Sequence, residues 1–259
     1  MARGNARQAI FLDDRDRRRF VGLLSRVAKR MNVRCHAYCL MANHYHLLLE
    51  TPDANLSLAI RQLNGIYAQS FNRRHDRVGH LFQGRFVSKL IDHAAYLLTV
   101  SRYIVMNPVR GGLVRHPALW VWSSYRATAG LIATPGFLVV DDVLADLGSM
   151  HRQEARRAYR RFVLDTSEID ELGDGPILGD SEFCARHESQ LTERSLDPDI
   201  PRRQRFAGRP SLESIFAGRV DRAARDARIR TAYLDHGYTM ATIARHLGVH
   251  RMTVSRIVK

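Results

Sequence analysis

The sequence predicts an α+β fold in which an antiparallel β-hairpin packs against amphipathic helices, with an all-helical region toward the C-terminus. Residues 33–40 and 44–50 are two apolar runs joined by a short connection, which is typical of an antiparallel hairpin. Apolar residues recur at helical spacing before and after this hairpin, and again near the C-terminus. With 259 residues, of which 45% are hydrophobic, the chain can form one large domain or a main domain and a smaller one.

The charge balance favours a polyanionic partner. The chain carries 40 Lys and Arg residues against 26 Asp and Glu residues, a formal net charge of +14, and nucleic acid is the simplest partner for such a chain. We expect no membrane partner, because no apolar run approaches the roughly 20 residues of a transmembrane helix and no signal peptide opens the chain. Cys35, Cys39 and Cys184 include no Cys-x-x-Cys pair and suit the reducing cytoplasm.

The first predicted helix is capped by Asp13 or Asp14 and runs to about residue 29 or 31. Its apolar residues keep one face, and its arginines, which include Arg15, Arg17, Arg18 and Arg19, lie on the other. We interpret those arginines as a solvated helix face rather than as a DNA-binding patch.

Two histidines lie at the start of the second predicted strand. His44 and His46 point to the same side of that strand, because side chains alternate with period two. Neutral imidazole is a common metal ligand, so the pair is a candidate metal site. The alternative is a pair of ordinary half-buried histidines. A zinc site that adds Cys35 and Cys39 is also open, although buried core cysteines are the simpler interpretation.

The next segments are an amphipathic helix, a basic turn and a strand. The helix is predicted over about residues 56–71, the turn covers residues 72–77, and residues 79–90 are predicted to be a loop and then a strand. Arg85 is a candidate contact to a phosphate backbone, although the neighbouring Gly84 is equally typical of a kink in a strand.

A further helix, from a cap at Asp92 to near Asn107, carries a second candidate group. Tyr103 and Asn107 are four residues apart and share one helix face, so both side chains can reach a site near the histidines. Pro108 biases Asn107 away from helical geometry and weakens this expectation. On spacing alone, a core tyrosine and a helix-end asparagine are the favoured explanation of the pair.

The middle of the chain offers packing elements and linkers. Residues 120–125 form an aromatic segment suited to packing, with stacking on a base as the alternative. Residues 141–147 and 153–164 are predicted short helices. Residues 166–180 are acidic and residues 198–210 are rich in Pro and Arg, so both are predicted linkers.

The C-terminal residues have the pattern of a helix-turn-helix. A helix over residues 220–236 is followed by a cap at Thr239, a turn at Gly248 and a last helix over residues 250–258. A helical hairpin or a dimer contact is the alternative. The side chains that this region would offer to DNA are Arg245, Arg251, Thr253, Ser255 and Arg256.

Six motifs occur in one order across residues 3–130. They are Arg3-Gly4-Asn5, Cys39-Leu40-Met41-Ala42-Asn43-His44-Tyr45-His46-Leu47-Leu48, Gln62-Leu63-Asn64-Gly65, Gly79-His80-Leu81-Phe82-Gln83-Gly84-Arg85-Phe86, Ser101-Arg102-Tyr103-Ile104 leading into Asn107-Pro108-Val109-Arg110, and Trp122-Ser123-Ser124-Tyr125. In these motifs the chain resembles the single-tyrosine HUH transposases, and most closely the REP-associated tyrosine transposases, which have the IS200-like transposase fold.

The resemblance implies a ferredoxin-like antiparallel sheet and a site for cutting DNA. It implies that His44 and His46 are the HUH metal ligands, that Asn107 is the third ligand, and that Tyr103 is the nucleophile. It further implies Mg²⁺ or Mn²⁺ as cofactor, single-stranded DNA from a hairpin-forming repeat as substrate, a 5′-phosphotyrosyl intermediate, a homodimer, and a place in the cytoplasm with the nucleoid. We expect a transposase domain over residues 1–130, a helical extension with linkers over 131–210 and a helix-turn-helix region over 211–259.

One departure from the family pattern gives weight to another hypothesis. Family members have a strand before Arg-Gly-Asn, whereas Met1 lies almost against that motif here. We therefore expect either residues upstream of Met1 or a sheet that lacks this strand. The alternative function is a DNA-binding regulator with an inactive relic of the transposase domain, and a third is a zinc-stabilised DNA-binding module.

Overall fold

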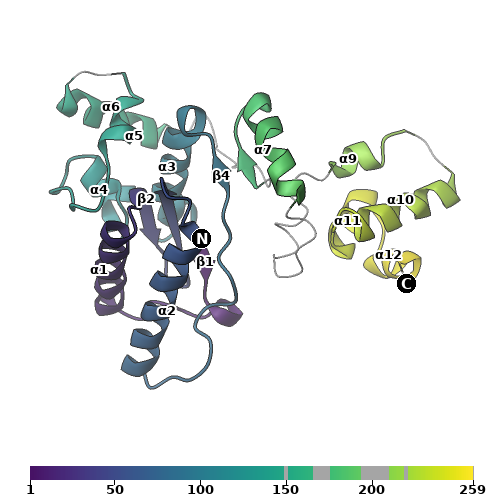
Figure 1. Ribbon diagram of the computed structural model, residues 1–259, viewed down its shortest axis with the longest axis horizontal. Coiled ribbons are helices and arrows are strands. Elements are labelled where there is room, and N and C mark those ends of the chain that lie inside the picture. The colour runs from purple at the N-terminus through teal and green to yellow at the C-terminus, as the bar shows by residue number, and fades with distance from the viewer. Residues whose placement is uncertain (149–150, 166–175, 194–209, 219–220, 259) are drawn as a thin grey trace. The chain divides into compact units, whose positions relative to one another are not determined.

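The structure is a computed structural model and describes residues 1–148, 151–165, 176–193, 210–218 and 221–258 (Figure 1). The chain divides into two compact units, residues 1–173 and 174–259. The first unit combines helices with a small antiparallel sheet, which confirms the predicted α+β class. It also continues past residue 130, where we predicted the transposase domain to end. The three predicted regions stay a prediction.

The sheet of the first unit has three antiparallel strands in the order β1-β3-β2. The predicted hairpin is present as β2 (Arg34–Leu40) and β3 (His44–Glu50). The strand β1 (Ala2–Arg3) is two residues long and pairs with the start of β3, with Arg3 opposite His44. We expected either residues upstream of Met1 or a sheet that lacks the strand before Arg-Gly-Asn. The structure has the short strand β1 beside the histidine pair.

The outer edge of β2 is covered by the aromatic segment that the sequence predicted to pack. The amide of Leu40 donates to the carbonyl of Trp122 at 2.9 Å, and the amide of Ser124 donates to the carbonyl of Tyr38 at 2.9 Å. Tyr125, which begins α4 (Tyr125–Thr128), is 1% exposed. These bonds satisfy backbone groups that an uncovered edge strand would expose.

One face of the sheet is covered by α1 (Asp14–Arg30) and α2 (Leu56–Arg74). The ring of Phe20 in α1 lies 4.7 Å from the ring of Tyr45 in β3 and 5.1 Å from the ring of Tyr67 in α2, measured between centroids. The Tyr45 hydroxyl donates to Oδ1 of Asn64 in α2 at 2.7 Å. Tyr45 thus faces the aromatic core, and the histidines on either side of it face the opposite way.

The opposite face of the sheet is covered by α3 (His93–Arg110), whose first turn is capped by Asp92. The predicted helix from a cap at Asp92 to near Asn107 is confirmed, although α3 continues three residues further, through Pro108 to Arg110. Proline has no amide to bond the carbonyl of Ile104, but the side-chain amide of Asn107 donates to that carbonyl at 3.3 Å. The lost backbone bond is replaced, and the helix continues.

The strand predicted within residues 79–90 is largely wrong. Strand pairing in this segment is confined to an isolated bridge between Gly4 and Phe82 and to the start of β4 (Leu90–Ile91), which is two residues long. The segment is held by single contacts instead, such as the amide of Gln83 donating to the carbonyl of Arg3 at 2.9 Å.

The rest of the first unit consists of short helices. They are η1 (Asn5–Arg7), η2 (Pro117–Leu119), α5 (Asp141–Ala145) and α6 (Arg152–Leu164). Both α5 and α6 pack against α3 and against each other, and Tyr159 of α6 is fully buried. The predicted helices over residues 141–147 and 153–164 are therefore confirmed, within two residues at each end.

The second unit is mainly helical. It contains β5 (Ile177–Leu178), α7 (Ser181–Glu193), α9 (Leu212–Ile215), α10 (Arg222–Leu234), α11 (Met240–Leu247) and α12 (Arg251–Val258). Ile229, Ile243 and Val254 are buried together in its core. As predicted, the Thr239 hydroxyl caps α11, and Gly248 ends that helix with a left-handed φ of 63°.

Most of the two predicted linkers, residues 166–175 and 198–209, lies outside the described residues. Among the helices that the structure describes, none is long and apolar enough to cross a membrane.

Candidate active site

The candidate site begins with two imidazoles on the sheet face that α3 covers. His44 and His46 alternate with the inward-facing Tyr45 along β3, and their ring centroids are 5.1 Å apart. The alternation of side chains along a strand therefore places both rings side by side, as the sequence predicted.

Both imidazoles are held in the neutral form. Burial, followed by the positive charge of Arg3, lowers the pKa of His44 to about 4. Burial, followed by the neighbouring His44, lowers the pKa of His46 to about 3. Because a histidine binds a metal only when a ring nitrogen carries a free lone pair, the environment suits metal ligation.

Asn43 fixes the orientation of the first imidazole. Its Oδ1 lies 2.7 Å from Nδ1 of His44, and its Nδ2 donates to the carbonyl of Arg7 at 3.0 Å. An amide oxygen can only accept, so Nδ1 of His44 carries the hydrogen and Nε2 carries the lone pair. This residue was not singled out from the sequence, although it stands in the quoted motif.

Packing of α3 on the sheet brings the candidate nucleophile to the histidines. The ring of Tyr103 lies 6.0 Å from the ring of His46, measured between centroids. The guanidinium of Arg110, two turns further along α3, lies 4.9 Å from the centroid of the Tyr103 ring. The Tyr103 ring thus lies near both an imidazole and a cation.

Asn107 lies one helical turn beyond Tyr103. Its Nδ2 donates to the carbonyl of Tyr103 at 2.8 Å as well as to that of Ile104. With the nitrogen turned toward the helix backbone, the amide oxygen remains as the atom available to a metal. Two neutral imidazoles and an amide oxygen are a donor set that divalent cations accept.

Comparison with known proteins identifies the family of this region. Residues 1–107 match the family model described as "Transposase IS200 like". This region belongs to the IS200-like transposase family. The transposase region includes every residue of the candidate site described above except Arg110.

One relative of the transposase region is a Haemophilus influenzae protein named as a REP-associated tyrosine transposase. It is 30% identical over 100 residues, which cover 34% of this chain and 57% of that protein. The chain thus spans little more than half the length of the relative. No solved structure matches the chain.

Two cations near the candidate site were not proposed as site residues from the sequence, namely Arg3 and Arg110. Arg3 lies opposite His44 in the strand pairing, and its Nε is buried with no hydrogen-bond partner among the described residues. Both arginines stand in quoted motifs, but the sequence does not show that Arg3 lies beside His44 or that Arg110 lies beside Tyr103.

The close packing around Gly4 explains why the Arg3-Gly4-Asn5 motif needs a glycine at this position. A Cβ at this position would lie 2.1 Å from the carbonyl oxygen of Gln8, so no other residue fits without a backbone shift. The amide of Gly4 donates to the carbonyl of Asn43 at 2.8 Å. The close approach therefore fixes β1 against the residue that orients His44.

The candidate DNA contacts lie apart from these side chains in the sequence, and their role stays a prediction. Arg85 is exposed in the loop after Phe82. In the second unit, Ser255 is half-buried, and the other candidates are exposed, namely Arg245, Arg251, Thr253 and Arg256.

The two cysteines near the histidines do not suit metal binding. Cys35 and Cys39 are both fully buried, and burial raises the pKa of each thiol to about 12. Among the described residues, neither thiol belongs to a group of three or more potential ligands that could hold one ion. This argues against the zinc-stabilised module.

Proposed function

We propose that this protein is a metal-dependent transposase that nicks and rejoins single-stranded DNA through Tyr103. The observation that carries the proposal is the 6.0 Å separation between the rings of Tyr103 and His46, within a region of the IS200-like transposase family. The two residues are 57 positions apart, and only the packing of α3 on the sheet brings them together.

In the proposed reaction, the Tyr103 oxygen attacks a backbone phosphorus atom. The new bond joins the phenol oxygen to the phosphorus, the bond from phosphorus to the 3′ oxygen breaks, and the proton lost by the phenol is balanced by the one gained by the 3′-hydroxyl. The 5′-phosphotyrosyl link conserves the energy of the phosphodiester. Attack by a 3′-hydroxyl in the reverse direction then rejoins a strand and frees Tyr103.

The residues that would hold the divalent cation are His44, His46 and Asn107. The resemblance to the transposase family implies that this cation is Mg²⁺ or Mn²⁺. When bound, such an ion polarises the phosphate oxygens and orients them for in-line attack. Asn43 keeps the lone pair of His44 on Nε2, and Tyr45 anchors the strand between the two ligands in the aromatic core.

Arg3 and Arg110 are the proposed cations for the DNA phosphates. The buried Nε of Arg3 lacks a partner among the described residues, and a phosphate oxygen would satisfy it. Arg110 lies beside the Tyr103 ring, where its charge can hold the phosphate that the phenol attacks.

The finer features of the protein belong to the same proposal. They are a ferredoxin-like HUH arrangement of the first unit, a helix-turn-helix formed by α11 and α12, a hairpin-forming repeat as substrate, and a homodimer. The name of the Haemophilus influenzae relative, REP-associated tyrosine transposase, supports a repeat as substrate. The exposed basic side chains of α12 support a DNA-binding surface.

A covalent adduct assay tests the proposal. The protein is incubated with a labelled single-stranded hairpin and Mn²⁺, and the products are separated under denaturing conditions. We expect a labelled protein band with the wild type and none with Tyr103→Phe. We expect at least about a 100-fold loss of adduct with His44→Ala, because a catalytic metal supplies several kcal/mol of transition-state stabilisation.

Matched variants separate chemistry from damage to the fold. Tyr96→Phe changes another half-buried tyrosine of α3 and is expected to keep the adduct. His80→Ala removes an exposed histidine and is expected to do the same. Hairpin binding without an adduct in the wild type would instead support the DNA-binding regulator, and an adduct with Tyr103→Phe would exclude Tyr103 as the nucleophile.

A further inference from the structure

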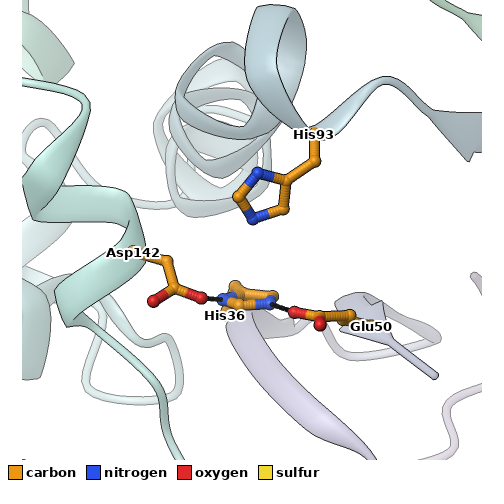
Figure 2. Close-up of side chains that lie close together, drawn as sticks. All are labelled: His36, Glu50, His93 and Asp142. Atoms are coloured by element: carbon orange, nitrogen blue, oxygen red, sulfur yellow. Dashed lines mark hydrogen bonds and ion pairs between the residues drawn. The ribbon is translucent and has the colours of Figure 1, made fainter. Parts of the chain in front are cut away.

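A second group of metal-capable side chains lies toward the other end of the hairpin from His44 and His46. Figure 2 shows His36 of β2 between Asp142 of α5 and Glu50 of β3, with His93 of α3 facing its ring. One potential ligand atom from each residue lies within 4.8 Å of the others. We propose that His36, His93 and Asp142 bind a divalent transition-metal ion, with Zn²⁺ as the best match, and that Glu50 orients His36.

A β-bulge directs His36 into this cluster. The pairing of β2 with β3 shifts between Cys35 and Ala37, so His36 is the extra residue of the bulge. A bulge changes the direction in which a side chain points, and bulges are common beside functional sites. The imidazole that it turns inward is 1% exposed.

The two nitrogens of His36 have different surroundings. Nε2 lies 2.9 Å from Oε2 of Glu50, whereas Nδ1 is buried and has no hydrogen-bond partner among the described residues. If Nε2 donates to Glu50, Nδ1 carries a lone pair. This arrangement of carboxylate, histidine and free lone pair is the one that supports metal-bound histidines in proteins.

The distance from Nδ1 of His36 to Oδ2 of Asp142 points to a cation between the two atoms. It is 3.7 Å, which is too long for a hydrogen bond. Two ligand atoms at about 2.1 Å from a tetrahedral Zn²⁺ lie roughly 3.4 Å apart. The pair therefore needs to move by only a few tenths of an ångström to share the ion.

Arg34 offers the competing explanation of the cluster as an ion-pair network. Its NH1 donates to both oxygens of Glu50 at 3.0 Å, and its NH2 donates to Oδ2 of Asp142 at 2.8 Å. The guanidinium brings one positive charge to two carboxylates, and it leaves Nδ1 of His36 without a hydrogen-bond partner among the described residues. A metal ion bound by Asp142 and Nδ1 of His36 would add positive charge and give that nitrogen a partner.

The donor set selects the class of metal. Two imidazoles with one carboxylate are typical of zinc sites, whereas Mg²⁺ prefers oxygen ligands and water. His93 is exposed and is the first residue of α3, so it can turn toward the ion. Because Tyr103 lies ten residues further along α3, about 15 Å at 1.5 Å per residue, the ion would fix the start of the helix that carries Tyr103.

Zinc titration of tag-free protein tests the second site independently of the proposed function. The protein carries His44→Ala and His46→Ala, which removes the first candidate site, and bound metal is stripped with EDTA before calorimetry and thermal melting. We expect one Zn²⁺ per chain and a rise in Tm of about 5–10 °C at a free concentration 100-fold above Kd. Mg²⁺ at the same concentration is expected to leave the Tm unchanged.

Further substitutions on that background locate the ion. His93→Ala is expected to weaken Zn²⁺ binding at least about 100-fold, and Glu50→Gln by about 10- to 100-fold through the orientation of His36. His80→Ala, which also removes an exposed histidine, is expected to leave the affinity unchanged, and the metal-free Tm of each variant reports whether it folds. Absence of stoichiometric Zn²⁺ binding, or equal binding after His93→Ala, would overturn the proposal in favour of the ion-pair network.

Discussion

The candidate ligands His44 and His46 are kept neutral by their surroundings. Burial lowers the pKa of His44 to about 4 and that of His46 to about 3. Each imidazole can therefore offer a lone pair to a metal well below neutral pH. The same burial makes these residues a source of acid sensitivity in the metal-free protein.

That acid sensitivity gives a pH prediction. Unfolded histidine takes up its proton near pH 6.5, whereas folded His46 does so at about pH 3, so the unfolded state binds more protons between these values. Stability conferred by neutral His46 is therefore present above pH 6.5 and is lost as the pH falls toward 3. In His46→Ala we expect the dependence of unfolding free energy on pH to become shallower, by at most about 1.4 kcal/mol per pH unit.

Urea unfolding in EDTA between pH 4.5 and 7 measures this dependence. The slope with His80→Ala should match that of the wild type, because this histidine is exposed. If the unfolding free energy of His46→Ala depends on pH as steeply as that of the wild type, His46 is not held neutral in the folded protein.

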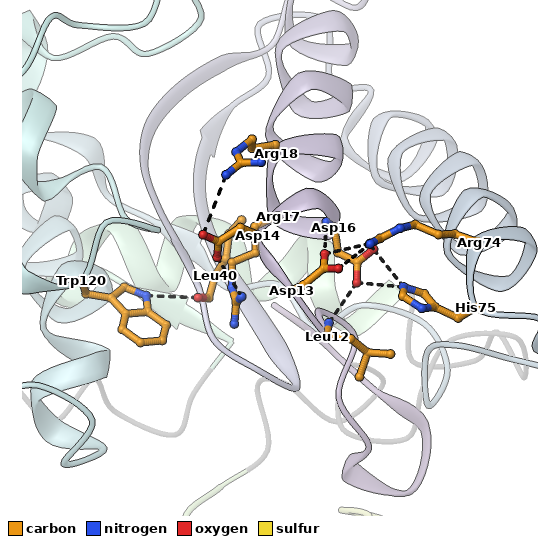
Figure 3. A network of polar contacts seen from close by, with 10 residues as sticks. All are labelled: Leu12, Asp13, Asp14, Asp16, Arg17, Arg18, Leu40, Arg74, His75 and Trp120. Atoms are coloured by element: carbon orange, nitrogen blue, oxygen red, sulfur yellow. Dashed lines mark hydrogen bonds and ion pairs between the residues drawn. The ribbon is translucent and has the colours of Figure 1, made fainter.

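At the scale of elements, a buried carboxylate joins the start of α1 to the end of α2. Asp16 is 3% exposed and accepts hydrogen bonds from the amide of Leu12 at 2.9 Å and from Arg74 at 2.5 Å, while His75 lies 3.0 Å away (Figure 3). Arg74 also pairs with Asp13, the cap of α1, and holds the pKa of that carboxyl well below its usual range. This network fixes the two helices that bury Tyr45.

Removal of the Asp16 charge should loosen this helix pair. Asp16→Asn keeps an acceptor for the Leu12 amide but leaves Arg74 and His75 without their buried partner, so we expect a loss of about 3 kcal/mol in unfolding free energy. Asp14→Asn is the matched control, since this carboxylate of α1 is 57% exposed and its two ion pairs are 3.6 and 3.9 Å long. Its effect should stay below about 0.5 kcal/mol by denaturant unfolding. Equal effects of the two substitutions would refute a special role for Asp16.

At the scale of the whole molecule, the chain combines a transposase region with a second, helical unit. The second unit has its own core, and α12 presents Arg251 and Arg256 to solvent while Val254 packs inward. We propose that the first unit cuts and rejoins DNA and that the second unit makes additional contacts with DNA.

This division predicts a change in salt dependence. In Arg251→Ala/Arg256→Ala we expect weaker binding of a short DNA duplex and a decrease of about 2 in the slope of log affinity against log salt, because each phosphate contact contributes roughly 0.9. Fluorescence anisotropy over a salt series measures the slope. Arg222→Ala, which changes an exposed arginine of α10, is the control, and adduct formation at Tyr103 should persist in both variants. An unchanged slope in the double variant would argue against α12 as a DNA-binding helix.

The sequence alone predicted most elements of this protein, together with the candidate metal ligands His44, His46 and Asn107 and the candidate nucleophile Tyr103. The bounds of β3, the start of α2 and the cap at Thr239 agree with the predictions, because alternation, helical periodicity and capping depend on residues close together in the chain. The ordered motifs led to the family to which residues 1–107 belong.

Tertiary packing decided the rest. Asn107 replaces the hydrogen bond lost at Pro108, which lets α3 continue where local preference would end it. The bulge at His36 forms only when β2 pairs with β3. The meeting of Tyr103 with His46 depends on the docking of α3 on one sheet face, an outcome of side-chain packing between distant segments that no local pattern specifies.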